Sequence, residues 1–291
     1  MNNLAKLRQR LQTSDSPAVQ GQWRSISACL DEDTGEFLNV GVMFQYAGKV
    51  ELRMLDSFER VKCLYGGRVS RDELEHLMQD IEETIRQSHW DLPDKISDTI
   101  RLGQPLYAQG ADAESVVDEF FLDVVTLGKP TNRLRNQNFR YRSSQKVRDT
   151  LFEIMREKMV LSADRIIQNE PYRLKLNNKA VIDVDVPLLS STAAGSIVSV
   201  WYKSPLVVEN NLLQAASDLL LISSNSERTK TSLSVLVPPS DSGMTNSEYN
   251  KQREMTKRHL DRFQQSGIEV IEAVSTDVLA NKTIEWWGRV A

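Results

Sequence analysis

The order of segments in the second half of the chain is the strongest constraint on the fold. From residue 143 onward, short apolar segments with strand character alternate with longer segments of helical period. The predicted strands cover 172–176, 180–188, 197–202, 233–237 and 268–273, and the predicted helices cover 143–159, 207–222, 247–265 and the region after 276. Because helices follow the later strands, this order predicts an α/β domain with a mixed sheet flanked by helices.

The first half has a different rhythm and predicts an α+β domain. Three alternating segments separated by turn residues predict an antiparallel meander, and the capping-box pair Ser70 and Glu73 predicts a helix over 70–88. The predicted meander strands cover 24–30, 37–46 and 50–55, followed after the helix by a strand over 101–108 and a helix over 113–127. We therefore expect a flexible arm at 1–20, an α+β domain at 21–128, a basic linker at 129–142 and an α/β domain at 143–291.

Composition excludes several classes of protein. No segment reaches the ~18 to 20 consecutive apolar residues that cross a bilayer, and the first 20 residues lack the apolar middle of a secretory signal. We therefore expect a cytoplasmic protein that makes no membrane contact, with Cys29 and Cys63 reduced. The three histidines are scattered polar-segment residues without ligand spacing, which predicts surface positions. The absence of a Gly-rich phosphate loop, a nucleophile elbow and a dinucleotide fingerprint disfavours nucleotide-dependent and acyl-transfer chemistry.

Candidate catalytic residues lie between 172 and 204. Strand alternation puts Asp183 and Asp185 on one face of their predicted strand. It likewise puts Ser199, Trp201 and Lys203 on one face of the next. Two interpretations stay open: the two faces converge into a site, or the aspartates are the solvent side of an amphipathic strand and Lys203 is a surface lysine.

Residues 143–274 resemble the PD-(D/E)xK nuclease superfamily, which has a restriction-endonuclease-like fold. The resemblance implies a Mg²⁺ ion held by Asp183 and Asp185, with Lys203 assisting the attacking water. It also implies a helix glutamate as a further ligand, for which the candidates are Glu153 and Glu157. Where the family has an acid two residues before the lysine, this chain has Trp201, so the resemblance implies a degenerate nuclease without a cofactor. An active enzyme would need Mg²⁺ and a displaced acid such as Glu209.

A second resemblance covers roughly the first 125 residues. The segment Glu36-Phe37-Leu38-Asn39-Val40-Gly41-Val42, after the Asp33-Thr34-Gly35 turn, resembles the opening hairpin of an uncharacterised bacterial and prophage family, a domain of unknown function. This family implies no activity. Gly41 inside a strand indicates a bulge or a close backbone approach, and Asn39 suits a side-chain-to-backbone hydrogen bond. We expect this hairpin to pack on the 70–88 helix.

An acid-free basic segment precedes the α/β domain, although the net charge of the whole chain is -4. Its basic residues are Lys129, Arg133, Arg135, Arg140, Arg142, Lys146 and Arg148, interleaved with Phe139 and Tyr141. One interpretation is a nucleic-acid interface, in which the basic side chains neutralise phosphates and the rings stack on unpaired bases. The alternative is a solvated linker that pairs with acids of the first domain, namely Asp112, Glu114, Asp118, Glu119 and Asp123.

Three hypotheses of function follow. The leading one is a phage-conflict or mobile-element protein whose degenerate nuclease-like domain binds nucleic acid or a nuclease partner without cleavage. The second is an active Mg²⁺-dependent nuclease. The third is a protein–protein inhibitor or assembly subunit that makes contact through residues 36–44 or through Trp286 and Trp287, a surface that a homo-oligomer would also use. The sequence leaves the choice between DNA and RNA open.

Overall fold

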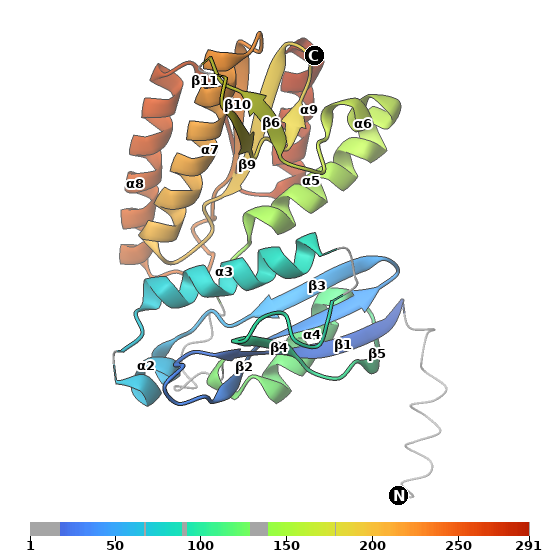
Figure 1. Cartoon of the computed structure of the whole chain (residues 1–291), viewed down its shortest axis with the longest axis vertical. Coiled ribbons are helices and arrows are strands. Elements are labelled where there is room, and N and C mark those ends of the chain that lie inside the picture. Colours follow the sequence, from blue (N-terminus) through green and yellow to red (C-terminus); the bar gives the residue numbers. More distant parts are fainter. Residues whose placement is uncertain (1–17, 67, 89–91, 129–138, 178, 291) are drawn as a thin grey trace, which may run out of the picture. The chain divides into compact units, whose positions relative to one another are not determined.

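The computed structural model describes residues 18–66, 68–88, 92–128, 139–177 and 179–290 (Figure 1). The chain divides into two compact units, residues 1–134 and 135–291. This boundary falls inside the expected basic linker, while most of the expected arm (1–17) and linker residues 129–138 lie outside the described residues. Both units are mixed α/β structures, and each is described below by itself.

The sheet of the first unit is built on the predicted antiparallel meander. Strands β1 (Val19–Cys29), β2 (Phe37–Tyr46) and β3 (Lys49–Met54) pair in sequence order. β1 begins earlier than predicted because its first residues pair with β5 (Leu106–Gly110), while its later residues pair with β4 (Ile100–Leu102). The strand predicted over 101–108 is therefore two strands, both antiparallel to β1.

Helices α3 (Arg71–Gln87) and α4 (Ala113–Val124) complete this unit, together with a short helix α2 (Glu59–Tyr65) that is not predicted from the sequence. The capping box predicted for α3 is present: the Glu73 amide donates to Ser70 Oγ, and the Ser70 amide donates to the Glu73 carboxylate. α4 packs on β2 and β3, and the Trp23 ring of β1 stacks on Phe120 of α4 with 4.2 Å between ring centroids.

The hairpin residues singled out in the sequence have structural roles. The Ser27 hydroxyl donates to Asn39 Oδ1, and Asn39 Nδ2 donates to the carbonyl of Val124 at the end of α4. Gly41 lies where the β1–β2 register shifts, and an added Cβ there would stand 3.0 Å from the backbone carbonyl oxygen of Arg53. The bulge and the close approach expected at Gly41 are both confirmed, and the side-chain-to-backbone bond of Asn39 goes to α4.

The second unit contains the mixed sheet expected from the segment order. Its strands follow the order β11-β10-β9-β8, in which β9 (Ala193–Ser199), β10 (Lys230–Leu236) and β11 (Ile268–Ala273) are parallel. The short β8 (Leu188–Leu189) runs antiparallel to β9. Helices α7 (Pro205–Asn225) and α8 (Asn246–Gln265) connect the parallel strands, as the crossovers of a parallel sheet require.

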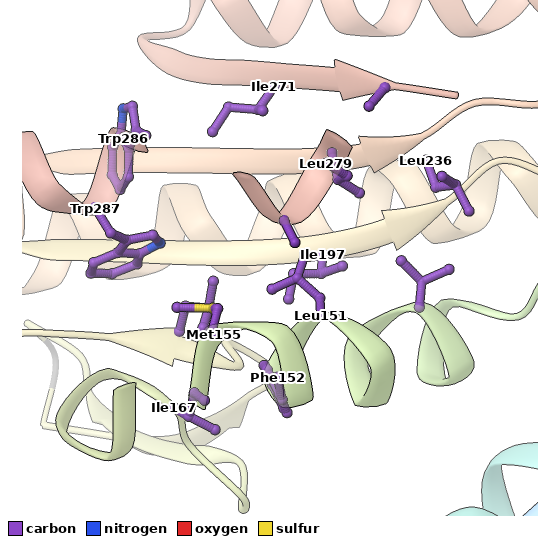
Figure 2. Close-up of a cluster of buried hydrophobic side chains, with 14 of the residues drawn as sticks. Leu151, Phe152, Met155, Ile167, Ile197, Leu236, Ile271, Leu279, Trp286 and Trp287 are labelled. Atoms are coloured by element: carbon purple, nitrogen blue, oxygen red, sulfur yellow. The ribbon is translucent and has the colours of Figure 1, made fainter. Parts of the chain in front are cut away.

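Two apolar clusters fix the layers of this unit. One joins one face of the sheet to α5 (Ser144–Met159) and α9 (Thr276–Val290), and it includes the buried Trp286 and Trp287. Figure 2 shows Leu151 and Met155 of α5 approaching Ile197 of β9 and Trp287 of α9 within this cluster. The other cluster joins the opposite face to α7 and α8. The sheet is therefore covered by helices on both faces.

Two predicted strands end earlier than expected. The segment 180–188 forms β7 (Val181–Val184), which pairs with β6 (Tyr172–Lys175) in a separate two-stranded sheet, and only β8 joins the main sheet. Pro187 lies between β7 and β8 and has no amide hydrogen to give to a ladder. β9 ends at Ser199, and Ser204 caps α7 with Pro205 at its first turn. Trp201 and Lys203 therefore lie in the loop between β9 and α7.

Candidate functional site

Asp183 forms an exposed surface pair. It lies on β7 opposite Arg173 of β6, and 3.7 Å separates Asp183 Oδ1 from Arg173 Nε. Both side chains are largely exposed, so the pair contributes little to stability. This geometry agrees with the interpretation of Asp183 as a solvent-facing residue.

Asp185 follows β7 and is held by two neighbouring elements. Arg148 Nη1 of α5 lies 2.7 Å from Asp185 Oδ2, and the Asp185 amide donates to Asp218 Oδ2 of α7 at 3.1 Å. Burial raises the pKa of Asp218, the bond from the Asp185 amide opposes that rise, and the Asp185 charge adds to it. The Asp185 carboxylate thus binds the Arg148 side chain, and the Asp218 carboxylate accepts the Asp185 amide, so neither carboxylate is free.

Lys203 does not join the acids. Its Nζ lies 4.7 Å from the centroid of the Phe139 ring, a cation–π contact. The expected shared face of Ser199, Trp201 and Lys203 is not formed, because the strand ends at Ser199. Within the described ranges, no group of three or more His, Cys, Asp or Glu side chains is arranged to hold a metal ion.

The glutamates considered as further ligands also lie apart. Glu153 and Glu157 are exposed on α5. Glu209 of α7 lies with its Oε1 3.3 Å from Nε2 of His259 on α8. His259 is buried, so its predicted surface position is wrong: it faces the α7–α8 contact because Gln252, Thr256 and Leu260 on the same side of α8 are buried too.

The basic segment contributes to closing the open edge of β9. β8 pairs only with the first residues of β9, which leaves the later backbone groups on that edge without a strand. The Arg148 Nε donates to the Ile197 carbonyl at 3.2 Å, and the Ser199 amide donates to Ser144 Oγ at 3.0 Å. The Arg142 amide donates to the Trp201 carbonyl at 3.3 Å. Side chains of α5 and the chain just before it therefore take the place of a neighbouring strand.

The two aromatic residues of the basic segment face the protein. Phe139 is only 5% exposed and belongs to the core that contains α5 and α9. Tyr141 stacks on Tyr202 with 5.5 Å between ring centroids. The expectation that these rings stack on unpaired bases is not favoured by this packing, because the rings already contact protein groups.

The basic side chains of the segment differ in exposure. Arg142 is exposed, and its guanidinium lies over the Trp201 ring at 4.8 Å from the centroid. Arg140 and Lys146 are half-buried and have interactions within the chain. Arg133 and Arg135 lie outside the described residues. Arg142 and Lys203 thus have their charged groups over aromatic rings in the region where the chain leaves β9.

The residues suggested for contact with a protein partner differ in exposure: Trp286, Trp287 and residues 40–44 are buried, whereas Glu36 is exposed and residues 37–39 are half-buried. Trp286 and Trp287 lie in the core of the second unit. In the 36–44 hairpin, Val40, Val42 and Phe44 are fully buried within the first unit. A partner that binds through Trp286 and Trp287 would have to displace core packing, whereas residues 36–39 are accessible without such a change.

Two residues of this region were not identified from the sequence. Ser144 follows the helix-capping Ser143, and nothing in the local pattern indicates that its hydroxyl reaches β9. Asp218 directly precedes three leucines on α7, and an acid beside such an apolar run is a signal of a specific partner.

Comparison with family models, curated proteins and solved structures found no significant match for this chain. None of the helices in the described part of the chain is long and apolar enough to cross a membrane.

Proposed function

We propose that the second unit binds nucleic acid without cutting it, through a cationic edge formed by Arg142 and Lys203 where the central strand β9 ends. One observation carries this proposal. The charged groups of both residues lie over aromatic rings, and neither is paired with a carboxylate among the described residues. These charges are therefore available to neutralise phosphates.

The position of this cationic edge supports the binding role. Ligands of α/β sheets bind at the carboxyl ends of parallel strands, and both residues follow or flank the carboxyl end of β9. α7 begins directly after this loop, so the positive end of its dipole faces the same region. Stacking on Trp201 and Phe139 also reduces the freedom of the two cationic side chains before any ligand arrives.

Binding without cleavage is favoured by the positions of the acids. Asp183 and Asp185 are paired with Arg173 and Arg148, and Trp201 stands where a nuclease of this type has its third acid. In this arrangement the two carboxylates are not free to hold a metal ion against a phosphate, as cleavage by this type of nuclease requires.

A degenerate restriction-endonuclease-like fold for this unit is part of the proposal. It is supported by the order of α5, the β6–β7 hairpin, β9, α7 and β10, and by the mixed sheet. The separate β6–β7 sheet departs from that arrangement, since the acids of the family lie on adjacent strands. The likeness of the 36–42 hairpin to a bacterial and prophage family favours a role in phage conflict or mobile elements.

The test is a binding titration by fluorescence anisotropy with single-stranded DNA, double-stranded DNA and RNA at about 50 mM and 200 mM salt. We expect the double variant Arg142→Gln/Lys203→Gln to bind about tenfold more weakly and to lower the salt slope by about two, one for each lost phosphate contact. The matched control is Arg262→Gln, an exposed arginine in the last turn of α8, which leads into the opposite end of the sheet.

The proposal fails if no nucleic acid binds at low salt, or if Arg262→Gln weakens binding as much as the double variant. Plasmid degradation in Mg²⁺ or Mn²⁺ that disappears in Asp185→Asn would show that the protein is an active nuclease, which contradicts the proposed binding without cleavage. Circular dichroism checks that the variant is folded.

A further inference from the structure

The start of α8 packs against the loop that joins β9 to α7. Gln252 of α8 is buried, and its side-chain amide donates to the carbonyl of Val200, the residue before Trp201. Tyr249, in the first turn of α8, packs on the apolar cluster that contains Trp201. Because these two contacts lie on either side of residues 250 and 251, this part of the helix lies at the carboxyl end of β9.

Lys251 lies on the side of α8 that faces α7. Positions four residues apart share a side of a helix, so Lys251 shares its side with Met255 and His259. Met255 packs on the apolar cluster that α8 forms with α7, and His259 Nε2 lies 3.3 Å from Glu209 Oε1 of α7. α7 begins where the loop that carries Lys203 ends. Lys251 is therefore on the same side of α8 as that loop.

The ammonium group of Lys251 is available to a ligand. Lys251 is exposed, and no carboxylate in the described part of the chain pairs with it. Glu248, one turn before it, accepts the amide and the hydroxyl of Thr245 at the start of the helix. Glu254, one turn after it, pairs with Arg258 at 2.7 Å. The nearest acids along the helix thus already have partners within the chain.

We propose that Lys251 is a third phosphate contact of the cationic edge, and that this edge binds the sugar–phosphate backbone without contacting bases. The inference rests on the proposed nucleic-acid binding by Arg142 and Lys203, and it specifies the chemistry of that binding. Each Lys or Arg that neutralises a phosphate releases counterions and adds to the salt dependence of binding. A third cation beside the first two therefore strengthens binding to any sequence.

The rings beneath the cationic groups are not open to bases. Trp201 and Phe139 are only 9% and 5% exposed. The charged groups of Arg142 and Lys203 lie over these two rings. Stacking of unpaired bases needs an accessible ring face, and contacts to phosphate carry no information about the base. We therefore expect affinity to follow the charge of the backbone and the salt concentration rather than the base sequence.

An anisotropy titration of Lys251→Gln measures the third contact. At about 50 mM salt we expect binding about threefold weaker than wild type, which is half of the tenfold effect of two contacts on a logarithmic scale. The salt slope should fall by about one. The matched control is Lys257→Gln on the same helix, where Glu254 and Asp261 on the same side are exposed too, and it should bind as wild type. Equal affinities and equal slopes for the two variants overturn the role of Lys251.

Strands with altered chemistry test the contact to the backbone. A single strand of abasic nucleotides keeps the sugar–phosphate chain and its charge, so it should bind within about fivefold of a base-bearing strand of equal length. A methylphosphonate strand of the same base sequence keeps the bases but loses the backbone charge, and it should not bind. A loss of more than about fivefold for the abasic strand, the least that one stacked base contributes, overturns binding through the backbone alone.

The outcomes separate this inference from the proposed function. Absence of binding to every nucleic acid at low salt overturns both. Binding that weakens in Arg142→Gln/Lys203→Gln but not in Lys251→Gln overturns the third contact alone. A triple variant of Arg142, Lys203 and Lys251, each changed to Gln, should lower the salt slope by about three, and circular dichroism checks that every variant is folded.

Discussion

The carboxyl group of Asp218 lies in an environment that disfavours its charged form. It lies on α7, accepts the amide of Asp185, and has the Asp185 and Arg148 side chains nearby. Burial is the largest influence and raises the pKa of Asp218, against the lowering effect of the amide and of Arg148. The proton therefore binds the folded protein more tightly than it binds the unfolded chain.

This difference predicts a pH-dependent effect of Asp218→Asn. Stability that comes from the protonated carboxyl is fully present below the ordinary Asp pKa of about 3.9 and is lost as pH rises through the raised pKa of the folded state. The Asn side chain keeps an oxygen for the Asp185 amide but cannot ionise. We expect Asp218→Asn to have the higher melting temperature at pH 7 and to lose this advantage as pH falls toward 4, as measured by thermal unfolding followed by circular dichroism.

Asp218→Ala serves as the comparison, because it removes the acceptor of the Asp185 amide as well as the charge. It should not share the gain at pH 7, since a lost partner for a half-buried amide costs about 1–3 kcal/mol. Parallel stability-versus-pH curves for wild type and Asp218→Asn would contradict the prediction.

At the scale of elements, α5 and β9 depend on each other through Arg148. Its side chain joins the carbonyl of Ile197 on β9 to the carboxylate of Asp185 after β7, so one guanidinium links three segments. Lysine carries the same charge but lacks the planar fork that reaches two acceptors at once.

We therefore expect Arg148→Gln to lower the free energy of unfolding by about 1–3 kcal/mol, with Arg148→Lys recovering only part of the loss. Chemical denaturation in urea measures both. Arg156→Gln on the same helix is the control, because its pair with Asp164 is exposed. A loss in Arg148→Gln no larger than in Arg156→Gln would show that the edge does not need this side chain.

Local signals explain which elements could be predicted. The Ser70–Glu73 capping box defines the start of α3, and the apolar spacing of the long helices α5, α7 and α8 depends only on nearby residues. The early start of β1 depends on its pairing with β5, which lies far along the chain, and no local pattern contains that information.

The residues of the candidate site likewise divide into those that nearby sequence predicts and those that depend on distant parts of the chain. Alternation correctly separates the exposed Asp183 from the buried Val184 on β7. The expected convergence with Lys203 required two long adjacent strands, but Pro187 and the Ser204 cap shorten both segments. The roles of Arg148 and Ser144 arise from the missing neighbour of β9, which is a property of the assembled sheet.

At the scale of the molecule, each compact unit has its own apolar core. The core of the second unit extends to Phe139, ahead of the first residue of α5. The unit is therefore complete only if the residues just before α5 are included.

This predicts that a chain of residues 135–291 folds alone and unfolds cooperatively, whereas a chain of residues 143–291 is less stable by about 3–5 kcal/mol, the usual cost of removing a buried phenylalanine. Urea unfolding followed by circular dichroism measures the difference. Restoring residues 135–142 with Phe139→Ala should reproduce most of the loss, and equal stability of the 135–291 and 143–291 chains would refute the prediction.

The closure of β9 by side chains also affects how copies of the chain behave at high concentration. An uncovered strand edge is a template for aggregation, since its free amides and carbonyls can bind a strand from any neighbour. Here Arg148, Ser144 and the Arg142 amide already occupy the Ile197, Ser199 and Trp201 groups on that edge. The same contacts that hold α5 in place thus protect the second unit from edge-to-edge aggregation at this strand.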